Sequence, residues 1–474
     1  MNQDHTPLFH ALLEHIQHKT SSYHVPGHKN GTIGSEEFLT YFQSVLPFDV
    51  TELRGLDDLH YPTGPIAESE QLLADLYHVA NSRFLVNGST AGNLAMILAT
   101  TRPGDEVYVQ RDSHKSIFHG LELAQVKPII MPSEMDPQTN MVVGIDVEKV
   151  KNEIKKHPER KVAIFTYPNY YGMGPFLEDL FRWMHNEGRI ILVDEAHGAH
   201  FPIHPSFPKS ALEMGADVVV QSAHKILPAM TMGAFLHMQS FYPYRNRIDS
   251  FLQMIQTSSP SYPIMASLDY ARYYAAHFTK EKINKLVQKR ASFLRELKKI
   301  PQIQVVHASE RFIQDPLKIT LQSSTTLTGY GLQQALEQER IYTELADMER
   351  VLFVLPLSEE WDGEEIVAAL KAIVKDRPVL TKQASSFIPS LNNTKPFPYC
   401  YQQLQQKQVL RVPLKESIGE IAAESIIPYP PGIPFILKGE QIEQEQVKIL
   451  QTLQQHQAYF QGNDGSEILI YGKE

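Results

Sequence analysis

The chain has 474 residues, of which 42% are hydrophobic and 21% charged, so it is long enough for two or three domains with a large core. Its formal net charge of −10 argues against a nucleic-acid partner, because no excess of lysine and arginine is present to neutralise phosphates. The single cysteine, Cys400, excludes an intramolecular disulfide framework and a cysteine-rich metal site. No signal peptide and no apolar run long enough to span a bilayer is found, so we expect a cytoplasmic protein without a membrane partner.

Apolar patterning in the first half predicts an arm followed by a large domain. The N-terminal arm, residues 1–65, is poor in periodic apolar pattern and rich in turn residues. The large domain, residues 66–280, alternates helices with strands. Strands are predicted at 84–86, 106–110, 126–131, 162–166, 190–193, 218–221 and 234–237, and helices at 69–78, 90–100 and 115–124. This alternation indicates an α/β fold with a mostly parallel sheet covered on both faces.

The second half predicts two smaller domains. A charged helical stretch over 270–299 leads into a small α/β domain, residues 281–380. Its predicted elements are strands at 315–321, 341–345 and 351–356 and a helix at 363–375. A stretch rich in Ser, Asn and Pro, 382–398, is typical of a linker, and it opens a C-terminal domain, residues 381–474.

Two strand ends supply the most informative side chains. Ser222, His224 and Lys225 follow a Val-rich strand, at the carboxyl end where open α/β sheets bind ligands. A lysine in this place suits Schiff-base formation with an aldehyde cofactor, provided that its pKa is lowered. A neighbouring strand ends in Asp194, and His197 is placed to hydrogen-bond a phenolic oxygen of the ring. A lysine and an aspartate at two strand ends suggest pyridoxal phosphate, whose pyridinium nitrogen pairs with the acid.

Two further segments fit such a cofactor. Residues 87–93 (Asn-Gly-Ser-Thr-Ala-Gly-Asn) join a strand to a helix, so the Ser89 and Thr90 hydroxyls would lie beside free N–H groups and seat a phosphate. An ordinary helix cap is the alternative. His114 follows another strand and could lie over a flat ring and exchange protons. Its alternative is a helix-capping histidine.

A metal site was the other interpretation of the histidines near Asp194. His197, His200 and His204 have a spacing that allows metal ligation. Pro202 and Pro205 interrupt any helix that would align them, and no carboxylate partner stands at a diagnostic offset. We therefore predict no metal.

Seven segments, spread over nearly the whole chain, then carry a family resemblance. They are 25–29 (Val-Pro-Gly-His-Lys), 55–60 (Gly-Leu-Asp-Asp-Leu-His), 87–90 (Asn-Gly-Ser-Thr), 114–116 (His-Lys-Ser), 194–198 (Asp-Glu-Ala-His-Gly), 222–225 (Ser-Ala-His-Lys) and 428–434 (Pro-Tyr-Pro-Pro-Gly-Ile-Pro). The chain resembles the bacterial ornithine/lysine/arginine decarboxylases, of the short Gram-positive type without a wing domain. The resemblance implies an aspartate-aminotransferase-like pyridoxal-phosphate fold. One departure is Asn169, where relatives usually have a threonine.

The resemblance also implies roles for individual residues. Lys225 would be the Schiff-base lysine, Asp194 the partner of the pyridinium nitrogen and His114 the stacking histidine. The further cofactor-binding residues would be Ser89, Thr90, Ala91, His197, Ser222 and His224, with Thr257 and Ser258 reaching the phosphate of a neighbouring subunit. The active site would thus be shared within a homodimer or a larger homo-oligomer.

The expected reaction is decarboxylation of lysine, arginine or ornithine to CO₂ and an amine of polyamine biosynthesis. The cationic end of the substrate needs a carboxylate, for which Glu424 is the first candidate and Glu52 and Asp58 follow, although each could be a solvated surface acid. Alternatives are an aminotransferase, in which Arg411 would bind the substrate carboxylate, an aldolase, or a catalytically silent regulatory relative. The sequence does not select the substrate, since one methylene is worth only about 1–3 kcal/mol in a pocket.

Overall fold

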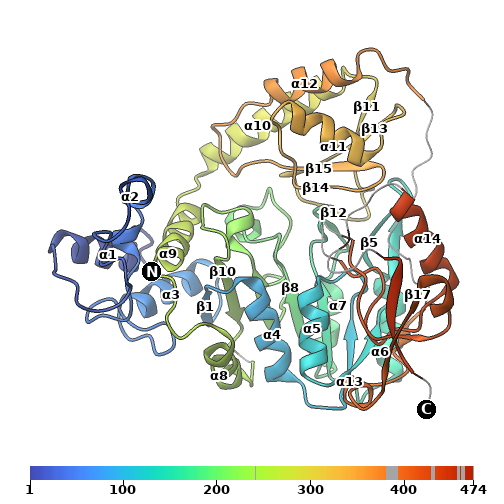
Figure 1. Cartoon of the computed structure of the whole chain (residues 1–474), viewed down its shortest axis with the longest axis horizontal. Helices are drawn as coiled ribbons and strands as arrows, with labels where there is room; N and C mark the ends of the chain where they lie inside the picture. Colours follow the sequence, from blue (N-terminus) through green and yellow to red (C-terminus); the bar gives the residue numbers. More distant parts are fainter. Residues whose placement is uncertain (241, 381–392, 429–432, 456–459, 461–464, 473–474) are drawn as a thin grey trace. The chain divides into compact units, whose positions relative to one another are not determined.

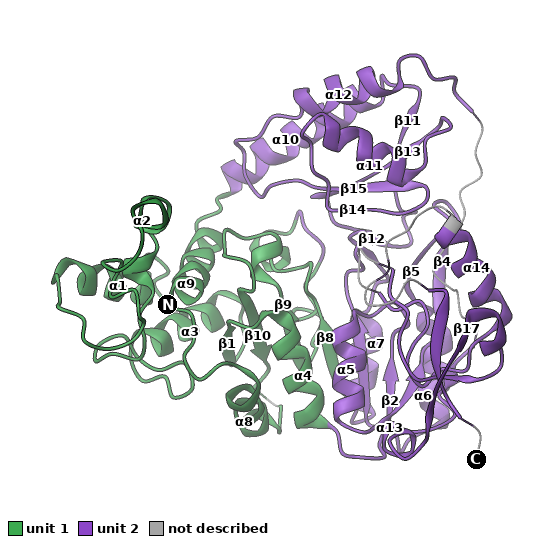
Figure 2. Cartoon of the chain, in the orientation of Figure 1, with its two compact units in different colours: residues 1–100, 191–205, 209–279 green, residues 101–190, 206–208, 280–474 purple. Residues whose placement is uncertain are grey.

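The computed structural model describes residues 1–240, 242–380, 393–428, 433–455, 460 and 465–472 (Figure 1). Within these ranges, no helix is both long and apolar enough to cross a membrane. Contacts within the chain divide it into two compact units (Figure 2). Unit 1 comprises residues 1–100, 191–205 and 209–279, and unit 2 comprises residues 101–190, 206–208 and 280–474. The four domain ranges expected from the sequence stay a prediction.

Unit 1 is built around strands that order as β1-β10-β9-β8. Its strands are β1 (Asn81–Leu85), β8 (Ile190–Asp194), β9 (Val218–Gln221) and β10 (Ala234–Met238), and its helices are α1 (Pro7–Gln17), α2 (Glu36–Phe42), α3 (Pro65–Leu76), α4 (Gly88–Thr100), α8 (Arg245–Ile255) and α9 (Tyr262–Ala276). Strand β10 is antiparallel to both of its neighbours, whereas β8 and β9 are parallel, so three of the four strands run in one direction. Every residue of β9 and β10 is buried, as their mostly apolar sequences predict.

Unit 2 contains the strand order β6-β2-β3-β16. These strands are β2 (Glu106–Val109), β3 (Lys127–Ile130), β6 (Val162–Thr166) and β16 (Lys395–Pro396), and the helices around them are α5 (Lys115–Leu123), α6 (Val147–Lys156) and α7 (Glu178–Asn186). Strand β2 is parallel to β3 and β6, and β16 pairs antiparallel with β3. The stretch predicted as a linker, 382–398, therefore ends in an edge strand of this sheet, while its residues 382–392 lie outside the described residues.

Unit 2 also holds a second sheet and a C-terminal subdomain. The second sheet orders as β11-β13-β15-β14, and the C-terminal one as β17-β19-β18. The remaining elements are β4 (Ser133–Asp136), β5 (Met141–Ile145), β7 (Met173–Gly174), β11 (Ile303–Val306), β12 (Ile313–Gln314), β13 (Lys318–Ser323), β14 (Leu345–Ala346), β15 (Arg350–Val354), β17 (Val409–Pro413), β18 (Ile421–Ala422), β19 (Glu467–Tyr471), α10 (Lys280–Leu297), α11 (Gly329–Gln338), α12 (Glu364–Val374), α13 (Tyr401–Leu404) and α14 (Gln444–Gln455). The buried Arg111 ties the C-terminal region to β2, since its guanidinium donates to the carbonyls of Pro434 and Phe435, both at 2.7 Å.

The predicted α/β fold with a mostly parallel sheet is confirmed. Three local expectations differ from the structure. Of the strand predicted at 341–345, only residue 345 lies in a strand, β14. The stretch predicted as one helical run, 270–299, spans the end of α9 and all of α10, which are separate helices because His277 leaves helical geometry at φ −102°. The arm was expected to lack apolar periodicity, yet α1 forms there and buries Leu8 and Leu12. The apolar repeat of α1 is short. The start of this helix also depends on a residue far along the chain, because Asp269 Oδ2 accepts from the Leu8 N–H at 3.1 Å.

Candidate functional site

The predicted lysine and aspartate lie at one edge of the unit 1 sheet. Strands β8 and β9 are parallel, with Asp194 opposite Val220, so their carboxyl ends meet at the same edge. Asp194 is the last residue of β8, and Lys225 lies in the 3₁₀ turn that follows β9, Ala223–Lys225. Lys225 Nζ is 3.1 Å from His197 Nε2. An amine, an imidazole and a carboxyl group thus share one sheet edge, all supplied by unit 1.

Asp194 is held by two donors in a buried position. Its side chain is 2% exposed and accepts hydrogen bonds from Asn93 Nδ2 at 2.9 Å and from the Ala196 N–H at 3.2 Å. Burial raises the pKa of Asp194 above its ordinary value, and the positive charge of Lys225 opposes that shift. A cation placed against this carboxyl would favour its ionised form further.

The start of α4 forms a seat for an anion. Gly88 opens the helix at φ +74°, a conformation that L-residues with side chains rarely adopt, and the first turn contains no acidic residue. Ser222 Oγ donates to Ser89 Oγ at 3.0 Å, so hydroxyls from β9 and α4 gather there, with Thr90 exposed beside them. Unpaired helix N–H groups and hydroxyls together bind phosphate well. The set fits pyridoxal phosphate, because an amine, a buried carboxyl group and this seat lie in one unit.

Close packing holds the seat against the strands. A Cβ atom on Gly92 would stand 2.7 Å from Leu85 Cδ1 and 2.9 Å from Val220 Cγ1, so α4 approaches β1 and β9 as only glycine permits. Ala91 is buried beside it. His224 is turned to the next strand, where its Nδ1 lies 2.9 Å from the Gly233 carbonyl oxygen. Nδ1 therefore carries a proton, which it donates to that carbonyl.

The other histidine predicted to contact the cofactor, His114, belongs to unit 2. It is the N-cap of α5, where its Nδ1 accepts from the Ser116 N–H at 3.3 Å and lies 2.9 Å from Ser116 Oγ. The helix-capping alternative is thus realised locally. It leaves Nε2 as the protonated nitrogen of the neutral ring.

The segment predicted to reach a neighbouring subunit lies beside the anion seat of its own chain. The side chains of Thr257 and Ser258 are exposed, and the Thr257 N–H donates to Asn87 Oδ1 at 3.3 Å. The Thr257 carbonyl oxygen is 2.9 Å from Nε2 of His60, a residue of the Gly-Leu-Asp-Asp-Leu-His segment. Two motifs far apart in the sequence therefore pack together in unit 1.

The three acids predicted for the substrate differ in their surroundings. Glu424, in unit 2, is half-buried, and its Oε1 accepts from the Leu469 N–H at 2.8 Å. Glu52 and Asp58 lie in unit 1, the first exposed and the second accepting from the His60 N–H at 2.8 Å. Both acids raise the pKa of Tyr262, after the larger effect of its burial, so their negative charges lie near its hydroxyl.

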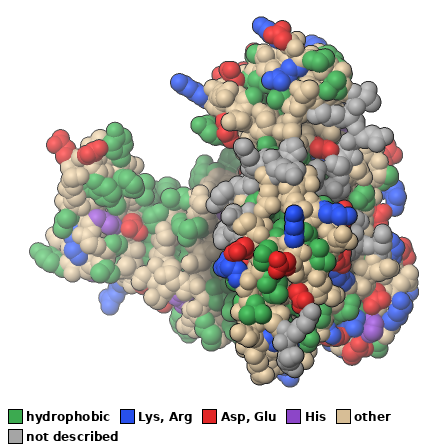
Figure 3. Space-filling model, turned by 45° about the vertical axis from the view of Figure 1, so that its right-hand side comes forward, with side chains coloured by type: hydrophobic (Ala, Val, Ile, Leu, Met, Phe, Trp, Pro, Cys, Tyr) green, Lys and Arg blue, Asp and Glu red, His purple; other side chains and the backbone are tan. Residues whose placement is uncertain are grey.

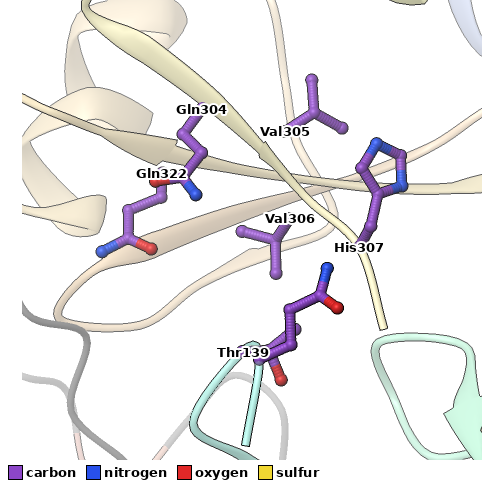
Figure 4. Close-up of a pocket in the computed structure, with 7 residues that line it drawn as sticks. Thr139, Gln304, Val305, Val306, His307 and Gln322 are labelled. Carbon is purple, nitrogen blue, oxygen red and sulfur yellow. The ribbon is translucent and has the colours of Figure 1, made fainter. Parts of the chain in front are cut away.

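Three further features concern the alternative interpretations of the sequence. Among the described residues, no group of three or more His, Cys, Asp or Glu side chains could hold a metal ion. Arg411, the residue an aminotransferase would use, has a side chain 58% exposed on β17 and pairs with Glu467 at 3.8 Å. A cavity of about 220 Å³ beside β11 is lined by neither amine nor carboxylate (Figure 4). Its lining is Gln138, Thr139, Gln304, Val305, Val306, His307 and Gln322.

Two residues show what sequence reasoning missed. Asn93 was noted in its segment without a role, although a polar side chain inside the apolar helix α4 was the available signal, and it is the donor to Asp194. Asn169, the departure from the family pattern, is buried and organises its own loop. Its Oδ1 accepts from the N–H groups of Tyr171 and Met173 at 3.0 and 2.9 Å. The Asn169 amide therefore makes hydrogen bonds within its own loop, at the position where relatives usually have a threonine hydroxyl.

Comparison with known proteins identifies the family of the chain. The model of the Orn/Lys/Arg decarboxylase major domain matches residues 6–362, and that of the family's C-terminal domain matches residues 381–472. An uncharacterised protein of Bacillus subtilis (strain 168), YaaO, is 41% identical over 99% of both chains. An arginine decarboxylase of the same strain is 30% identical over 95% of this chain and 94% of its own.

Solved structures show the fold. The constitutive lysine decarboxylase of Escherichia coli has a TM-score of 0.78 at 19% identity, covering 99% of this chain and 82% of that one. A ureidoglycine-glyoxylate aminotransferase of Bacillus subtilis has a TM-score of 0.54 at 14% identity, covering 65% of this chain and 84% of that one. The predicted aspartate-aminotransferase-like fold is confirmed. The chain belongs to the Orn/Lys/Arg decarboxylase family and is a pyridoxal-phosphate-dependent amino-acid decarboxylase.

Proposed function

We propose that the protein decarboxylates a basic L-amino acid, lysine, arginine or ornithine, to CO₂ and an amine used in polyamine biosynthesis. The observation that carries this proposal is the grouping of Lys225, His197 and Asp194 beside an anion seat at one sheet edge. The similarity to arginine decarboxylases over nearly the whole chain supports a basic substrate.

Each residue at the edge has a proposed task. When bound, pyridoxal phosphate accepts the electron pair left as the bond from Cα to the carboxylate breaks. Lys225 would hold the cofactor's aldehyde carbon, and Asp194 would keep the pyridine nitrogen protonated. The phosphate would be bound by Ser89, Thr90, Ala91, Ser222 and His224. Thr257 and Ser258, exposed beside the seat of their own chain, would also reach the phosphate held by a second copy. His114 would stack on the ring.

The contact between Lys225 and His197 bears on proton handling. At 3.1 Å, the imidazole and the amine can share a proton. A neutral amine is needed to bind an aldehyde, and a neighbouring imidazole that takes the proton would supply it. We propose that Lys225 or His114 afterwards returns a proton to Cα, which gives the amine product.

The distal cation of the substrate requires one acid, and we propose Glu424 first. It follows β18, it is half-buried, and a backbone N–H orients its carboxylate, which costs less on binding than ordering an exposed side chain. Glu52 and Asp58 remain the second candidates. The three variants Glu424→Gln, Glu52→Gln and Asp58→Asn separate them, since the true ligand should raise KM for the basic substrate most.

We further propose a homodimer in which the N-terminal arm contacts the second copy. Large apolar side chains are exposed on the arm (Figure 3, left). They are Tyr23, Val25, Ile33, Phe38, Tyr41, Phe42, Val45 and Tyr61. A concentration of exposed large apolar side chains on one segment is typical of a protein interface.

The deciding experiment incubates the purified protein with pyridoxal phosphate and lysine, arginine or ornithine separately and identifies the products by mass spectrometry. We expect cadaverine, agmatine or putrescine from one preferred substrate. Lys225→Ala should abolish the product and the cofactor's absorbance band, and Lys115→Ala, a lysine at the start of α5, serves as the matched control.

Two results would reject the proposal. Keto-acid production without amine would indicate an aminotransferase. No product from any of the three amino acids, with cofactor absorbance that still depends on Lys225, would leave a different substrate or a regulatory role.

A further inference from the structure

A chain of buried hydrogen bonds lies next to the site edge, within unit 1. Glu195 follows Asp194, and Gln221 precedes Ser222. The Gln221 side-chain amide donates to Glu195 Oε2 at 2.6 Å, and its Oε1 lies 3.2 Å from His237 Nε2. His237 Nδ1 lies 2.8 Å from Ser82 Oγ. The chain therefore links four strands, β8, β9, β10 and β1.

The carboxyl end of this chain is saturated with donors. Besides Gln221, Glu195 receives hydrogen bonds from the Ser210 hydroxyl at Oε2 and from the Ala211 N–H at Oε1, both at 2.7 Å. Glu195, Gln221, His237 and Ser210 are each 0% exposed. A group of polar side chains buried this completely is expensive unless each has its partner, so its place beside the site calls for a reason.

The order of donors and acceptors is fixed from one end. When Glu195 is ionised, its carboxylate only accepts, so it turns the Gln221 amide nitrogen toward itself and leaves Oε1 facing His237. His237 must then carry its proton on Nε2 and accept from Ser82 at Nδ1. The ring is neutral, because burial lowers the pKa of His237 to about 3.

A backbone hydrogen bond also joins the ends of β8 and β9. The Glu195 N–H donates to the Val220 carbonyl at 2.8 Å. A Cβ atom on Gly198 would stand 2.6 Å from Glu195 Cγ, so the turn that carries His197 closes directly on the Glu195 side chain. Any movement of Glu195 would thus be passed to the turns on both sides of the site.

We propose that Glu195 and Gln221 are positioning residues, whose buried hydrogen bond fixes the strand end that carries Asp194 relative to the strand end that carries Lys225. The inference rests on the proposed function, because it assigns both ends to the cofactor. It predicts that polarity, and not side-chain volume, is what this pair supplies.

The test compares Glu195→Gln with the swapped double variant Glu195→Gln/Gln221→Glu. In the single variant the amide at position 195 has one acceptor oxygen in place of two, so its NH2 group is set against at least one of the donors from Gln221, Ser210 and Ala211. The double variant restores one carboxylate and one amide between the same strands. Pyridoxal phosphate is titrated into the apoprotein at about pH 9, where Glu195 is ionised even though burial raises its pKa to about 8. The dissociation constant and the visible circular dichroism of the bound cofactor are measured, with Tm beside them.

In the single variant we expect the dissociation constant to rise roughly ten- to hundredfold and the dichroic band to shrink, because small displacements of binding groups cost that much. The double variant should recover most of both. Tyr242→Phe is the control for general destabilisation, since it removes a buried hydroxyl bonded to Thr100, the last residue of α4, away from the anion seat. Ser82→Ala, at the far end of the chain, should change the dissociation constant less than about threefold.

Cofactor binding and dichroism in Glu195→Gln that match Tyr242→Phe at equal Tm would overturn the proposal, as would a double variant no better than the single one. Should the single variant fail to fold, Gln221→Met tests the same bond, and wild-type cofactor binding in it would also overturn the proposal. Failure of the proposed function is seen separately, as a wild-type protein that forms no amine while the variants still differ in cofactor binding.

Discussion

The sheet edge of unit 1 and the arm that precedes it differ in where their side chains find partners. At the edge, Asp194 and Glu195 are buried and receive their hydrogen bonds from the same chain. On the arm, Tyr23 is 95% exposed and α2 has no buried residue. A helix of seven residues is not stable alone in water, so α2 requires contacts beyond its own side chains. The edge thus finds its hydrogen-bond partners within this chain, whereas the arm leaves large apolar side chains exposed.

The largest effect expected at the sheet edge is the loss of activity in Asp194→Asn. An amide cannot hold the pyridine nitrogen protonated, so we expect kcat to fall about 100- to 1000-fold, the size seen when one preorganised electrostatic partner is removed. Steady-state rates of amine formation measure this loss. Asn93→Ala removes only a donor to Asp194 and should cost about tenfold. Equal activity in Asp194→Asn and wild type would contradict the role given to this carboxyl group.

The sequence could predict the edge because its signals are local. Strands such as β9 are continuous apolar runs, and Asp194 and Lys225 stand directly after them. The partners at this edge could not be predicted, since Asn93 meets Asp194 only through helix packing and His237 meets Gln221 only through strand order. The structure of the arm could not be predicted from the sequence for a different reason.

In the arm, many large apolar side chains are exposed and do not face the chain's own core. The apolar periodicity toward that core is therefore weak outside α1. Helix α2 shows this directly, because none of its residues is buried. For the same reason the sequence could not rank Glu424, Glu52 and Asp58. Which of them meets the substrate depends on packing between segments far apart in the chain, and not on the residues next to each acid.

The arm is tested by Phe38→Ser/Phe42→Ser. The two rings stack with centroids 4.7 Å apart and remain 41% and 48% exposed. Their burial against a second copy would be worth about 2–3 kcal/mol, so the variant should weaken the dimer roughly 30- to 150-fold. Analytical ultracentrifugation measures the change. Phe176→Ser, an exposed phenylalanine outside the arm, is the control. A wild-type protein that sediments as a monomer at micromolar concentration would contradict the assignment of this surface.

Glu70 should make the free energy of unfolding depend on pH. It is buried in α3, accepts from the Phe84 N–H at 2.9 Å, and its pKa is raised to about 7 by burial, with Arg83 opposing. The folded state thus favours protonated Glu70, so this stabilisation is present below about pH 4.5 and is lost as pH rises through about 7. Glu70→Gln stays uncharged and should remove about 2–3 kcal/mol of the decline in the free energy of unfolding between these values. Urea unfolding at several pH values measures it, and identical pH profiles would contradict it.

The smallest expected effect separates two neighbours in the Gly-Leu-Asp-Asp-Leu-His segment. Asp57, at φ +71°, accepts from the N–H groups of Thr63, Gly64, Ile66 and Ala67 and so caps α3. Asp57→Ala should cost about 1–2 kcal/mol of unfolding free energy, the range of lost helix caps.

Asp58 provides the matched control, because it accepts only from the His60 N–H among the hydrogen bonds found for its side chain in the described residues. Asp58→Ala should leave Tm nearly unchanged, and KM should rise only if Asp58 binds the substrate cation. A fall in Tm for Asp58→Ala as large as that for Asp57→Ala would mean that both acids serve the join between the arm and the sheet. The segment would then owe its sequence to folding alone, and Glu424 would be left as the first candidate for the substrate's distal charge.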